Sequence, residues 1–526
     1  MPFTKPKIVT AKEAASVIQD GMVLAINAMA STSYPDALSV ALYDRYQKTK
    51  TPRNITFWGA TAQSMYTHDG LTERLARCEG MITKATLGHW ISCPTLSKNA
   101  GEGKIAGYNL PQGIISHLYR AAAGRKPVVV SRIGLKTFAD PRFGGGKLNN
   151  LCDENMVEVV EIDGKEYLQY KTPKIDVCFV RGTTASPEGN ITAEKEAAYV
   201  DALTLAMATK ANGGIVIAQV ERLSDRRAPA KNILIPGVLI DYLVVDPEQR
   251  QTHIEIYNPA YSGETIMPAY QIKAHINLVL EKSGSFFAER QLVHYIIARR
   301  AAEEVKAGDV VNIGIGLPGL VPGIIAEKGI QDTVLMTNEV GTFGGVPAPA
   351  GSFGASLNPM MITDMPTMFD FYDGGILDVV CVGAAQIDKG GNVNAGKIGS
   401  RIIGVGGFTN ITFDARKVVF LTTFTDIKGM EADYANGALT IKREGSLQKF
   451  IDSVEQISFS GEIAIEDKKE ILYITERCVF RLTPKGLMIT EIAPGIDIEK
   501  DIIANMGFKP LVADNIVFMK SEFFKI

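Results

Sequence analysis

One carboxylate after an apolar segment is the strongest candidate for chemistry in this sequence. Thr333–Thr337 is short, apolar and rich in β-branched residues, which is typical of a buried strand. Glu339 follows it and enters a loop that contains Gly341, Gly344 and Gly345. Open α/β sheets bind ligands at the carboxyl ends of strands, and glycines allow another molecule to approach the backbone. Glu339 is therefore a candidate site residue, although a carboxylate that caps the following turn fits the local pattern as well.

Two other glycine-rich stretches suggest different chemistries. Gly314–Gly319 follows a predicted strand and fits the G-x-G-x-x-G dinucleotide fingerprint, with Glu339 at the distance of a ribose-binding acid. Pro318 weakens this interpretation, because proline has no backbone N–H to donate. Gly391–Lys397 resembles a phosphate-binding P-loop, but the next residue is Ile398, whereas the motif requires a Ser or Thr there to bind magnesium. An NAD-dependent dehydrogenase stays open as an alternative.

Histidine and cysteine patterns offer no familiar site. None of the six histidines lies beyond residue 294, so the second half has no histidine base, and no Gly-x-Ser-x-Gly elbow is present. His89, beside Trp90, is a candidate pocket residue, although such histidines are more often structural. No cluster has metal-ligand spacing, so we expect no metal. Six scattered cysteines without a Cys-x-x-Cys motif suit a reducing cytosol.

Length and charge restrict the class of protein. With 526 residues, two to four domains are expected. The net charge is −3 and no long basic run occurs, which argues against a nucleic-acid partner. No apolar run approaches the ~18 residues of a membrane span, and the N-terminus lacks an apolar signal core. We therefore expect a cytoplasmic protein without nucleic-acid or membrane partners.

The second half of the chain repeats the pattern of the first. Three pairs of stretches occur in the same order: Thr10–Ile26 and Leu292–Ile313, Ile175–Thr192 and Leu377–Asn394, Gly214–Ala218 and Lys417–Leu421. Apolar strands alternate with helical stretches in both halves, which predicts an α/β fold of two related open domains whose mostly parallel sheets are covered by helices. We place the boundary in the polar stretch 270–288, between domains 1–280 and 281–526, and expect the ligand between them.

Several longer motifs follow one another along nearly the whole chain. They are Tyr108–Gly113, Gly134–Arg142, Gly145–Lys147, Arg181–Thr184, Glu339–Val346, Phe369–Gly375, Gly404–Phe408, Ile474–Arg477 and Glu491–Gly495. In order and spacing they resemble the family I CoA-transferases, in the single-chain acetate/propionate CoA-transferase branch. The resemblance implies transfer of CoA from a short-chain acyl-CoA, such as acetyl-CoA, to a small carboxylic acid. It implies coenzyme A as a substrate and covalent intermediate, and no permanently bound cofactor.

The resemblance also implies roles for individual residues. Glu339 corresponds to the nucleophile, which would form an acyl-glutamyl anhydride and then a glutamyl-CoA thioester. A glutamate with a pKa of about 4.3 is already ionised at pH 7 and needs no general base. Gln112 corresponds to the oxyanion amide, with Gly406 and Gly407 as its backbone partner, although a turn residue after Pro111 is the alternative for Gln112. The residues corresponding to loops against CoA are Gly314, Ile315, Gly316, Leu317, Pro318 and Gly404.

One stretch departs from the family pattern. Where relatives often have a glycine-rich turn after their first strand, this chain has Asn27–Tyr34. We expect these bulkier residues to line the acid pocket together with Trp58 and Thr61–Asp69, so the preferred acid does not follow from relatives. We expect a homo-oligomer, a dimer or tetramer. An acyl-CoA hydrolase and a non-catalytic sensor on the same fold stay open as further alternatives.

Overall fold

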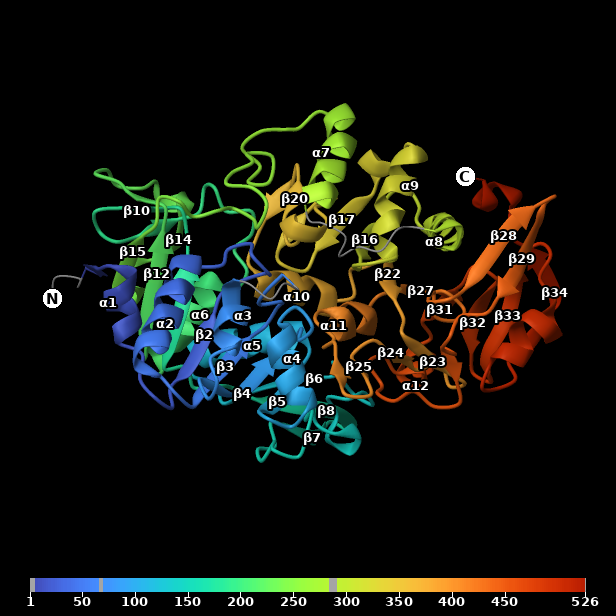
Figure 1. The fold of residues 1–526 in the computed structure, drawn as a ribbon, viewed down its shortest axis with the longest axis horizontal. Helices are drawn as coiled ribbons and strands as arrows, with labels where there is room; N and C mark the ends of the chain where they lie inside the picture. Colours follow the sequence, from blue (N-terminus) through green and yellow to red (C-terminus); the bar gives the residue numbers. More distant parts are fainter. Residues whose placement is uncertain (1–4, 66–69, 283–290, 526) are drawn as a thin grey trace.

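The structure is a computed structural model that describes residues 5–65, 70–282 and 291–525, which form two α/β halves (Figure 1). The first half, coloured blue to green, contributes an eight-stranded sheet. The second half, coloured yellow to red, contributes a ten-stranded sheet. The predicted α/β fold is confirmed.

All neighbouring strands of the first sheet run parallel. In spatial order they are β1 (Lys7–Ile8), β15 (Tyr242–Val245), β12 (Ile215–Val220), β9 (Val177–Arg181), β2 (Val23–Ile26), β3 (Ile55–Gly59), β4 (Ile82–Leu87) and β5 (Ala106–Asn109). Every residue of β9 is buried, as expected for a central strand of a parallel sheet with both faces covered.

The second sheet has a parallel centre and mixed ends. In spatial order its strands are β21 (Met361–Ile362), β18 (Thr342–Phe343), β17 (Leu335–Asn338), β16 (Val310–Ile313), β22 (Val379–Gly383), β27 (Lys417–Leu421), β31 (Glu470–Ile474), β32 (Cys478–Thr483), β33 (Gly486–Ile492) and β34 (Leu511–Phe518). The five strands from β17 to β31 are parallel. The extension from β32 to β34 was not predicted.

The predicted internal repeat corresponds to a repeated strand order. In the first sheet β12, β9, β2 and β3 are consecutive neighbours, and in the second β27, β22, β16 and β17 are. Each predicted pair of stretches therefore contributes strands to equivalent places. The two Gly-Asn turns also recur, in the antiparallel hairpins β10–β11 and β23–β24.

Twelve α-helices are found among the described residues. They are α1 (Ala11–Ser16), α2 (Asp36–Thr49), α3 (Leu71–Ala76), α4 (Pro94–Gly101), α5 (Gln112–Ala123), α6 (Ala202–Ala211), α7 (Ala269–Lys282), α8 (Leu292–Ala301), α9 (Val321–Glu327), α10 (Met365–Asp373), α11 (Phe408–Phe413) and α12 (Gly461–Glu466). Thr10 and Glu13 form a capping box at the start of α1. A 3₁₀ turn, Ala302–Glu304, follows α8 directly. None of these helices has the length and apolar character needed to cross a bilayer.

The segment between the halves is more structured than its polar composition suggests. It forms α7, whose Ile272 and Ile276 pack against a small cluster of buried residues that includes Leu357 of the second half. The predicted division at residues 280 and 281 falls in the last turn of α7, and Ser283–Ser285 lie outside the described residues. The division stays a prediction.

Smaller sheets decorate both halves. They are formed by β13 (Arg222–Leu223), β10 (Thr184–Ala185), β11 (Ile191–Thr192) and β14 (Ile233–Ile235); by β6 (Val128–Ser131), β8 (Lys165–Lys171) and β7 (Val157–Ile162); by β24 (Val393–Asn394), β23 (Gln386–Asp388) and β30 (Phe450–Ile451); and by the pairs β19 (Val346–Pro347) and β20 (Ser356–Leu357), β25 (Lys397–Ile398) and β26 (Arg401–Ile402), β28 (Glu431–Ala435) and β29 (Ala438–Arg443). The hairpin β28–β29 and the edge strand β34 lie at the right-hand end of the molecule in Figure 1.

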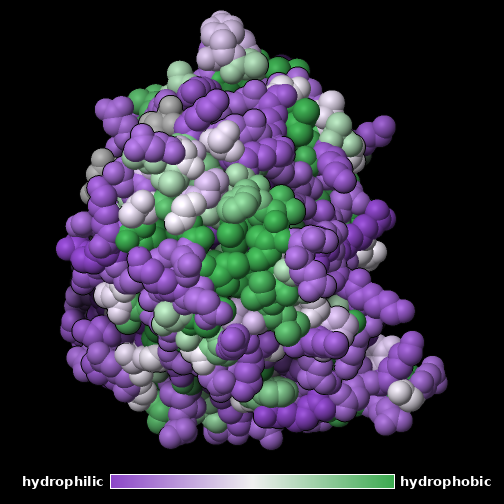
Figure 2. All heavy atoms as spheres, turned by 90° about the vertical axis from the view of Figure 1, so that its right-hand side faces the viewer, coloured by the Kyte–Doolittle hydropathy of each residue, from purple (hydrophilic) through white to green (hydrophobic). Residues whose placement is uncertain are grey.

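This end carries exposed apolar groups. Viewed toward it, the surface shows an apolar area surrounded by hydrophilic residues (Figure 2). The edge strand β34 at this end exposes the side chains of Leu511, Val512, Val517 and Phe518, the last two by 62%.

Candidate functional site

Glu339 lies at the tip of a tight hairpin. It follows β17 directly, and β17 pairs with β18 in antiparallel register, with Asn338 opposite Thr342. Gly341 closes the turn by donating its N–H to the Asn338 carbonyl at 3.0 Å. The carboxylate is therefore placed at the carboxyl end of a strand in a largely parallel sheet, as predicted.

The glycines after Glu339 are required by the chain itself. Gly341 has a φ of +114°, and a methyl group there would clash with the Thr363 carbonyl. Gly345 has a φ of +74°, and a methyl group would clash with the Leu357 carbonyl. The sequence predicts that these glycines admit another molecule. The structure shows instead that they admit the protein's own neighbouring backbone.

Glu339 is half-buried and is not neutralised by a cation. Burial raises the pKa of its carboxyl, and the Glu339 backbone N–H offsets this only partly. Among the described residues, no Lys, Arg or His forms an ion pair with Glu339. A carboxylate in such surroundings keeps little solvation and is available to react with an electrophile.

Gln112 is the first residue of α5 and is buried. Its backbone N–H donates to the Gly406 carbonyl of the second half at 2.9 Å. Its side-chain Nε2 lies 3.3 Å from the Met365 sulfur, which is a weak acceptor. The structure thus places the predicted oxyanion amide at the contact between the two halves.

Gly406 and Gly407 differ in the state of their N–H groups. The Gly406 N–H donates to the Gly88 carbonyl at 2.8 Å, so the prediction that it serves as an oxyanion donor conflicts with this contact. Gly407 precedes α11, and no hydrogen-bond partner of its N–H is found among the described residues. Of the two glycines, Gly407 is the one whose N–H is free to bind a ligand atom.

The four predicted catalytic residues meet at this glycine pair. A methyl group added to Gly406 would lie 3.6 Å from the Gln112 Oε1 atom, and one added to Gly407 would lie 3.7 Å from the Glu339 Cβ atom. Gln112 and Glu339, which are separated by more than two hundred residues, therefore flank one turn from opposite halves. At this turn Gln112 presents its acceptor oxygen, while its donor Nε2 faces the Met365 sulfur, so the carboxamide would have to turn to donate to an oxyanion.

The residues predicted to contact CoA lie near this turn. The loop that starts at Gly314 follows β16, the parallel neighbour of β17, so it leaves the sheet beside Glu339. Ile315 is exposed, and a methyl group on Gly316 would meet no atom within 4 Å, which leaves this loop open to a ligand. Leu317 and Pro318 continue it into a 3₁₀ turn.

Gly404 packs against the first half. It has a φ of +76°, and a methyl group there would come within 2.6 Å of the Trp90 backbone nitrogen. Gly404 is thereby required for close contact between the halves, two residues before Gly406.

The expected acid pocket is built from loops after β2 and β3. Met29 and Thr32 contact the second half, where the Thr32 hydroxyl donates to the Phe353 carbonyl at 3.1 Å. Buried side-chain oxygens of Ser31, Gln63 and Ser64 have no hydrogen-bond partner among the residues that the structure describes. Buried polar atoms without partners are costly, so a bound polar group would stabilise this region. Of the predicted segment Thr61–Asp69, residues 66–69 lie outside the described residues.

His89, a candidate pocket residue from the sequence, and two asparagines are further neighbours of the site. His89 lies beside the glycine turn, since a methyl group on Gly406 would be 3.7 Å from its Cδ2 atom. Burial lowers the pKa of His89 to about 4, so its ring is neutral at pH 7. Asn109 links the halves by accepting from the Val405 N–H at 3.3 Å, and Asn410 does so by accepting from the Gly113 N–H at 3.0 Å. Asn109 lies within the motif Tyr108–Gly113, whereas no local pattern marks Asn410.

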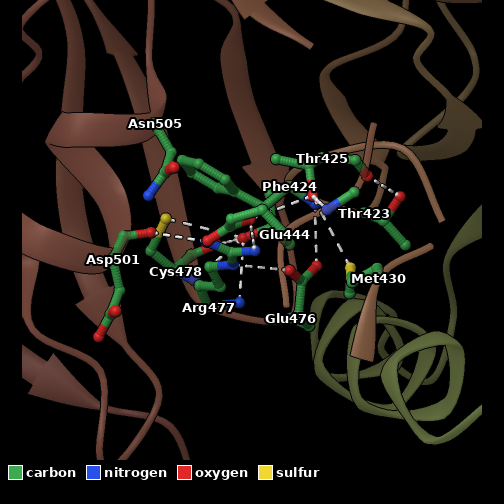
Figure 3. Close-up of polar contacts among 12 residues, drawn as sticks. Thr423, Phe424, Thr425, Met430, Glu444, Glu476, Arg477, Cys478, Asp501 and Asn505 are labelled. Carbon is green, nitrogen blue, oxygen red and sulfur yellow. Dashed lines mark hydrogen bonds and ion pairs between the residues drawn. The ribbon is translucent and has the colours of Figure 1, made fainter. Parts of the chain in front are cut away.

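Other motifs proved to be structural. The P-loop-like stretch Gly391–Lys397 begins in a β-hairpin turn and does not lead into a helix. Glu476 and Arg477 lie in a buried polar network between β31 and β32 (Figure 3). There the Arg477 guanidinium contacts Glu476 at 2.9 Å, Glu444 at 2.6 Å and the face of the Phe424 ring. No group of three potential metal ligands occurs in the described part of the chain.

Comparison with known proteins identifies the family. The model of the coenzyme A transferase family matches residues 8–246 and 295–502. The caffeate CoA-transferase of Acetobacterium woodii is 40% identical over 98% of this chain and 97% of its own length. The acetate CoA-transferase YdiF of Escherichia coli K12 is 38% identical over 98% of this chain and 95% of its own. The crystal structure of YdiF from E. coli O157:H7 superimposes with a TM-score of 0.90, covers 99% of this chain and 96% of that one, and is 36% identical.

These matches leave no support for the dinucleotide-binding alternative at Gly314–Gly319. They extend over both sheets and include the Glu339 loop, the Gln112 helix and the glycine turn. The chain belongs to the coenzyme A transferase family.

Proposed function

We propose that this CoA-transferase moves CoA from a short-chain acyl-CoA to a small carboxylic acid, with Glu339 as the covalent nucleophile in a ping-pong reaction. The observation that carries the proposal is the meeting of Glu339, Gln112 and Gly407 around one turn. A relative's crystal structure is described as a thioester complex of the YdiF acyl-CoA transferase with CoA, and that protein is 36% identical to this chain. This description supports a thioester intermediate here.

The proposed steps balance without an external base. The Glu339 carboxylate attacks the thioester carbonyl carbon, the C–S bond breaks, and CoA leaves as a thiolate from an acyl-glutamyl anhydride. The thiolate then attacks the glutamyl carbonyl and releases the first acid as a carboxylate, leaving a glutamyl-CoA thioester. An incoming carboxylate reverses both steps. Each tetrahedral intermediate carries an oxyanion, to which the Gly407 N–H would donate, together with the Gln112 Nε2 after it turns from the Met365 sulfur.

Trapping the covalent intermediate tests this assignment. After incubation with acetyl-CoA and then borohydride, mass spectrometry should find Glu339 alone reduced, and Glu339→Gln should show no reduced residue. An unmodified Glu339 peptide in an active preparation would refute the role of this residue.

The acid that accepts CoA is the open part of the proposal. One relative is named for caffeate and another for acetate. We infer a small acid with a polar substituent, because Ser31, Gln63 and Ser64 present buried oxygens without partners near the expected pocket. A panel of acetate, propionate, lactate and caffeate against one acyl-CoA should give its highest kcat/KM with lactate. Preference for propionate over lactate would contradict this inference.

A hydrolase is the second candidate on the same fold. Water would take the place of the acceptor acid and attack the glutamyl thioester. Glu339 is half-buried and packs beside the glycine turn, which leaves little space for solvent at its carboxylate. This favours transfer of CoA to an acid over hydrolysis. Thiol release from acetyl-CoA should therefore depend on added carboxylate, and release at an equal rate without acceptor would identify a hydrolase.

We also propose that the protein works in the cytoplasm as a homo-oligomer. All six cysteines are buried and unpaired, which suits a reducing compartment. Edge strands with exposed apolar side chains favour association, and β34 is such a strand. We infer that a second copy of the chain covers it. Sedimentation should show a smaller species for Phe518→Glu, and an unchanged one for Ile266→Glu, whose side chain is also exposed. An unchanged size for Phe518→Glu would exclude β34 from the interface.

A further inference from the structure

The first turn of α5 is capped by the other half of the molecule. A helix leaves its first N–H groups without partners inside the helix, and Pro111, which precedes α5, provides no side-chain cap. The Gly406 carbonyl accepts from the Gln112 N–H at 2.9 Å, and the Asn410 Oδ1 atom accepts from the Gly113 N–H at 3.0 Å. The second half therefore fixes the turn that carries Gln112.

Asn410 is well placed to set distances within the site. It is fully buried and belongs to α11, the short helix that begins directly after Gly407. A methyl group on Gly113 would lie 2.5 Å from the Asn410 Nδ2 atom, so the two segments touch. One side chain thus connects the segment of Gly407 with the segment of Gln112.

Asp373 fixes which end of the Asn410 carboxamide faces Gly113. The Nδ2 atom of Asn410 donates to the Asp373 carboxylate oxygens at 3.1 and 3.4 Å. The Gly113 N–H can only donate and an ionised Asp373 carboxylate can only accept, so the amide oxygen faces Gly113 and the amide nitrogen faces Asp373. The chain of contacts runs from Asp373 through Asn410 to α5.

The surroundings of Asp373 contain further charges. The His117 Nδ1 atom of α5 lies 3.7 Å from Asp373, and its Nε2 atom lies 2.9 Å from Asp370 of α10. Asp414 follows α11 directly. Burial raises the pKa of Asp373 to about 7, opposed by His117 and Asn410 and assisted by Asp414 and Asp370.

We propose that Asn410 is a positioning residue for CoA transfer, which keeps Gln112 and Gly407 in register while Asp373 directs its carboxamide oxygen at Gly113. This inference rests on the proposed function, since it assigns the two held groups to the oxyanion. In the proposed role Asn410 does not touch the substrate and acts through the two segments that it joins.

Asn410→Asp replaces the amide nitrogen that donates to Asp373 with a carboxylate oxygen. The new carboxylate still accepts from Gly113, but its second oxygen faces Asp373, and two adjacent carboxylates cannot both ionise without repulsion. We expect kcat to fall by up to about 10²-fold through misplacement of the donors, with KM for acyl-CoA nearly unchanged. The loss should grow as pH rises, because the proton shared by residues 410 and 373 is released.

The double variant Asn410→Asp/Asp373→Asn provides the rescue. It exchanges carboxylate and amide between the two positions at constant net charge, so the Asn at 373 donates to the Asp at 410, which accepts from Gly113. We expect kcat to recover most of the loss and the added pH dependence to disappear. Asp373→Asn alone should lose less than Asn410→Asp, since its side-chain oxygen can still accept from Asn410.

Asn410→Ala serves as the matched control, because it introduces no second carboxylate and cannot accept from Gly113. It should lose kcat, and adding Asp373→Asn should not restore it. The inference is overturned if the exchanged pair is no better than Asn410→Asp, or if the single variants lose melting temperature but keep normal turnover per folded molecule. Borohydride trapping on wild-type Glu339 tests the proposed function separately. If Glu339 is trapped but the double variant does not recover kcat, the proposed function stands and only the role of Asn410 is refuted.

Discussion

At the residue scale, Gln112 has an unusual partner. Its amide nitrogen contacts the Met365 sulfur, a weak acceptor, at 3.3 Å. The Gln112 amide gives up only a weak hydrogen bond when it turns to a developing oxyanion. It should therefore stabilise mainly the transition state and hardly the bound substrate. We expect Gln112→Ala to lower kcat by roughly 10²–10³, equivalent to about 3–4 kcal/mol, with a small change in KM.

Gln112→Glu should be worse than Gln112→Ala, because a carboxylate cannot donate and repels the oxyanion. Steady-state kinetics and thermal melting of both variants show whether Gln112 acts in catalysis or only stabilises the fold. A stable Gln112→Ala variant with unimpaired kcat would remove this residue from the mechanism.

The raised pKa of Glu339 has a predictable effect on the pH profile. The nucleophile is the ionised carboxylate, which exists above the pKa of the folded protein, and burial moves that pKa upward. Activity should therefore be lost as pH falls, with a midpoint in kcat/KM above the value of about 4.3 for a free glutamate. Measuring borohydride-trapped Glu339 over the same pH range assigns the midpoint to this residue. A midpoint at or below the free value would contradict the burial argument.

The sequence predicted Glu339 and Gln112 as reacting groups, but not the contacts that hold them. Glu339 and Gln112 follow recognisable strand ends and carry family motifs, so both were predicted. Asn410 and Gly113 are separated by 297 residues, and their hydrogen bond depends on how two domains dock, which no local periodicity encodes. The same reason explains why Gly406 was expected to donate freely, whereas the docked Gly88 carbonyl accepts from its N–H.

At the element scale, α5, α10 and α11 form the contact on which the site depends. Gly113 allows these helices to pack closely, because a methyl group at this position would clash with the Phe369 ring and with Asn410. We expect Gly113→Ala to destabilise the fold by about 1–3 kcal/mol, as overpacking does, and to lower kcat as well. Denaturant unfolding and kinetics measure the two effects.

Gly124→Ala is the control at the other end of the same helix. Gly124 has a φ of −89°, and its nearest atom to an added methyl group lies at 3.6 Å. This variant should retain wild-type stability and turnover. Equal behaviour of the two variants would show that the packing at Gly113 has no special importance.

At the scale of the whole molecule, the proposed site is divided between the two halves. The first half carries Gln112 and the expected acid pocket, and the second carries Glu339 and the glycine turn. Separately expressed 1–280 and 281–526 should each be inactive and should regain transfer activity when mixed. Adding Gln112→Ala to the first fragment should abolish most of that recovery. Full activity of 281–526 alone would refute a site shared between the halves.

Several hydrogen bonds between the halves near the site join main-chain atoms only. The Trp90 N–H donates to the Ile403 carbonyl, the Gln112 N–H to the Gly406 carbonyl, and the Gly406 N–H to the Gly88 carbonyl. Main-chain atoms are the same in every relative, so halves from different parents should recognise one another. A hybrid would then inherit its choice of acid from one parent and its nucleophile from the other. Substrate preference in this family would be transferable by recombination at a single crossover.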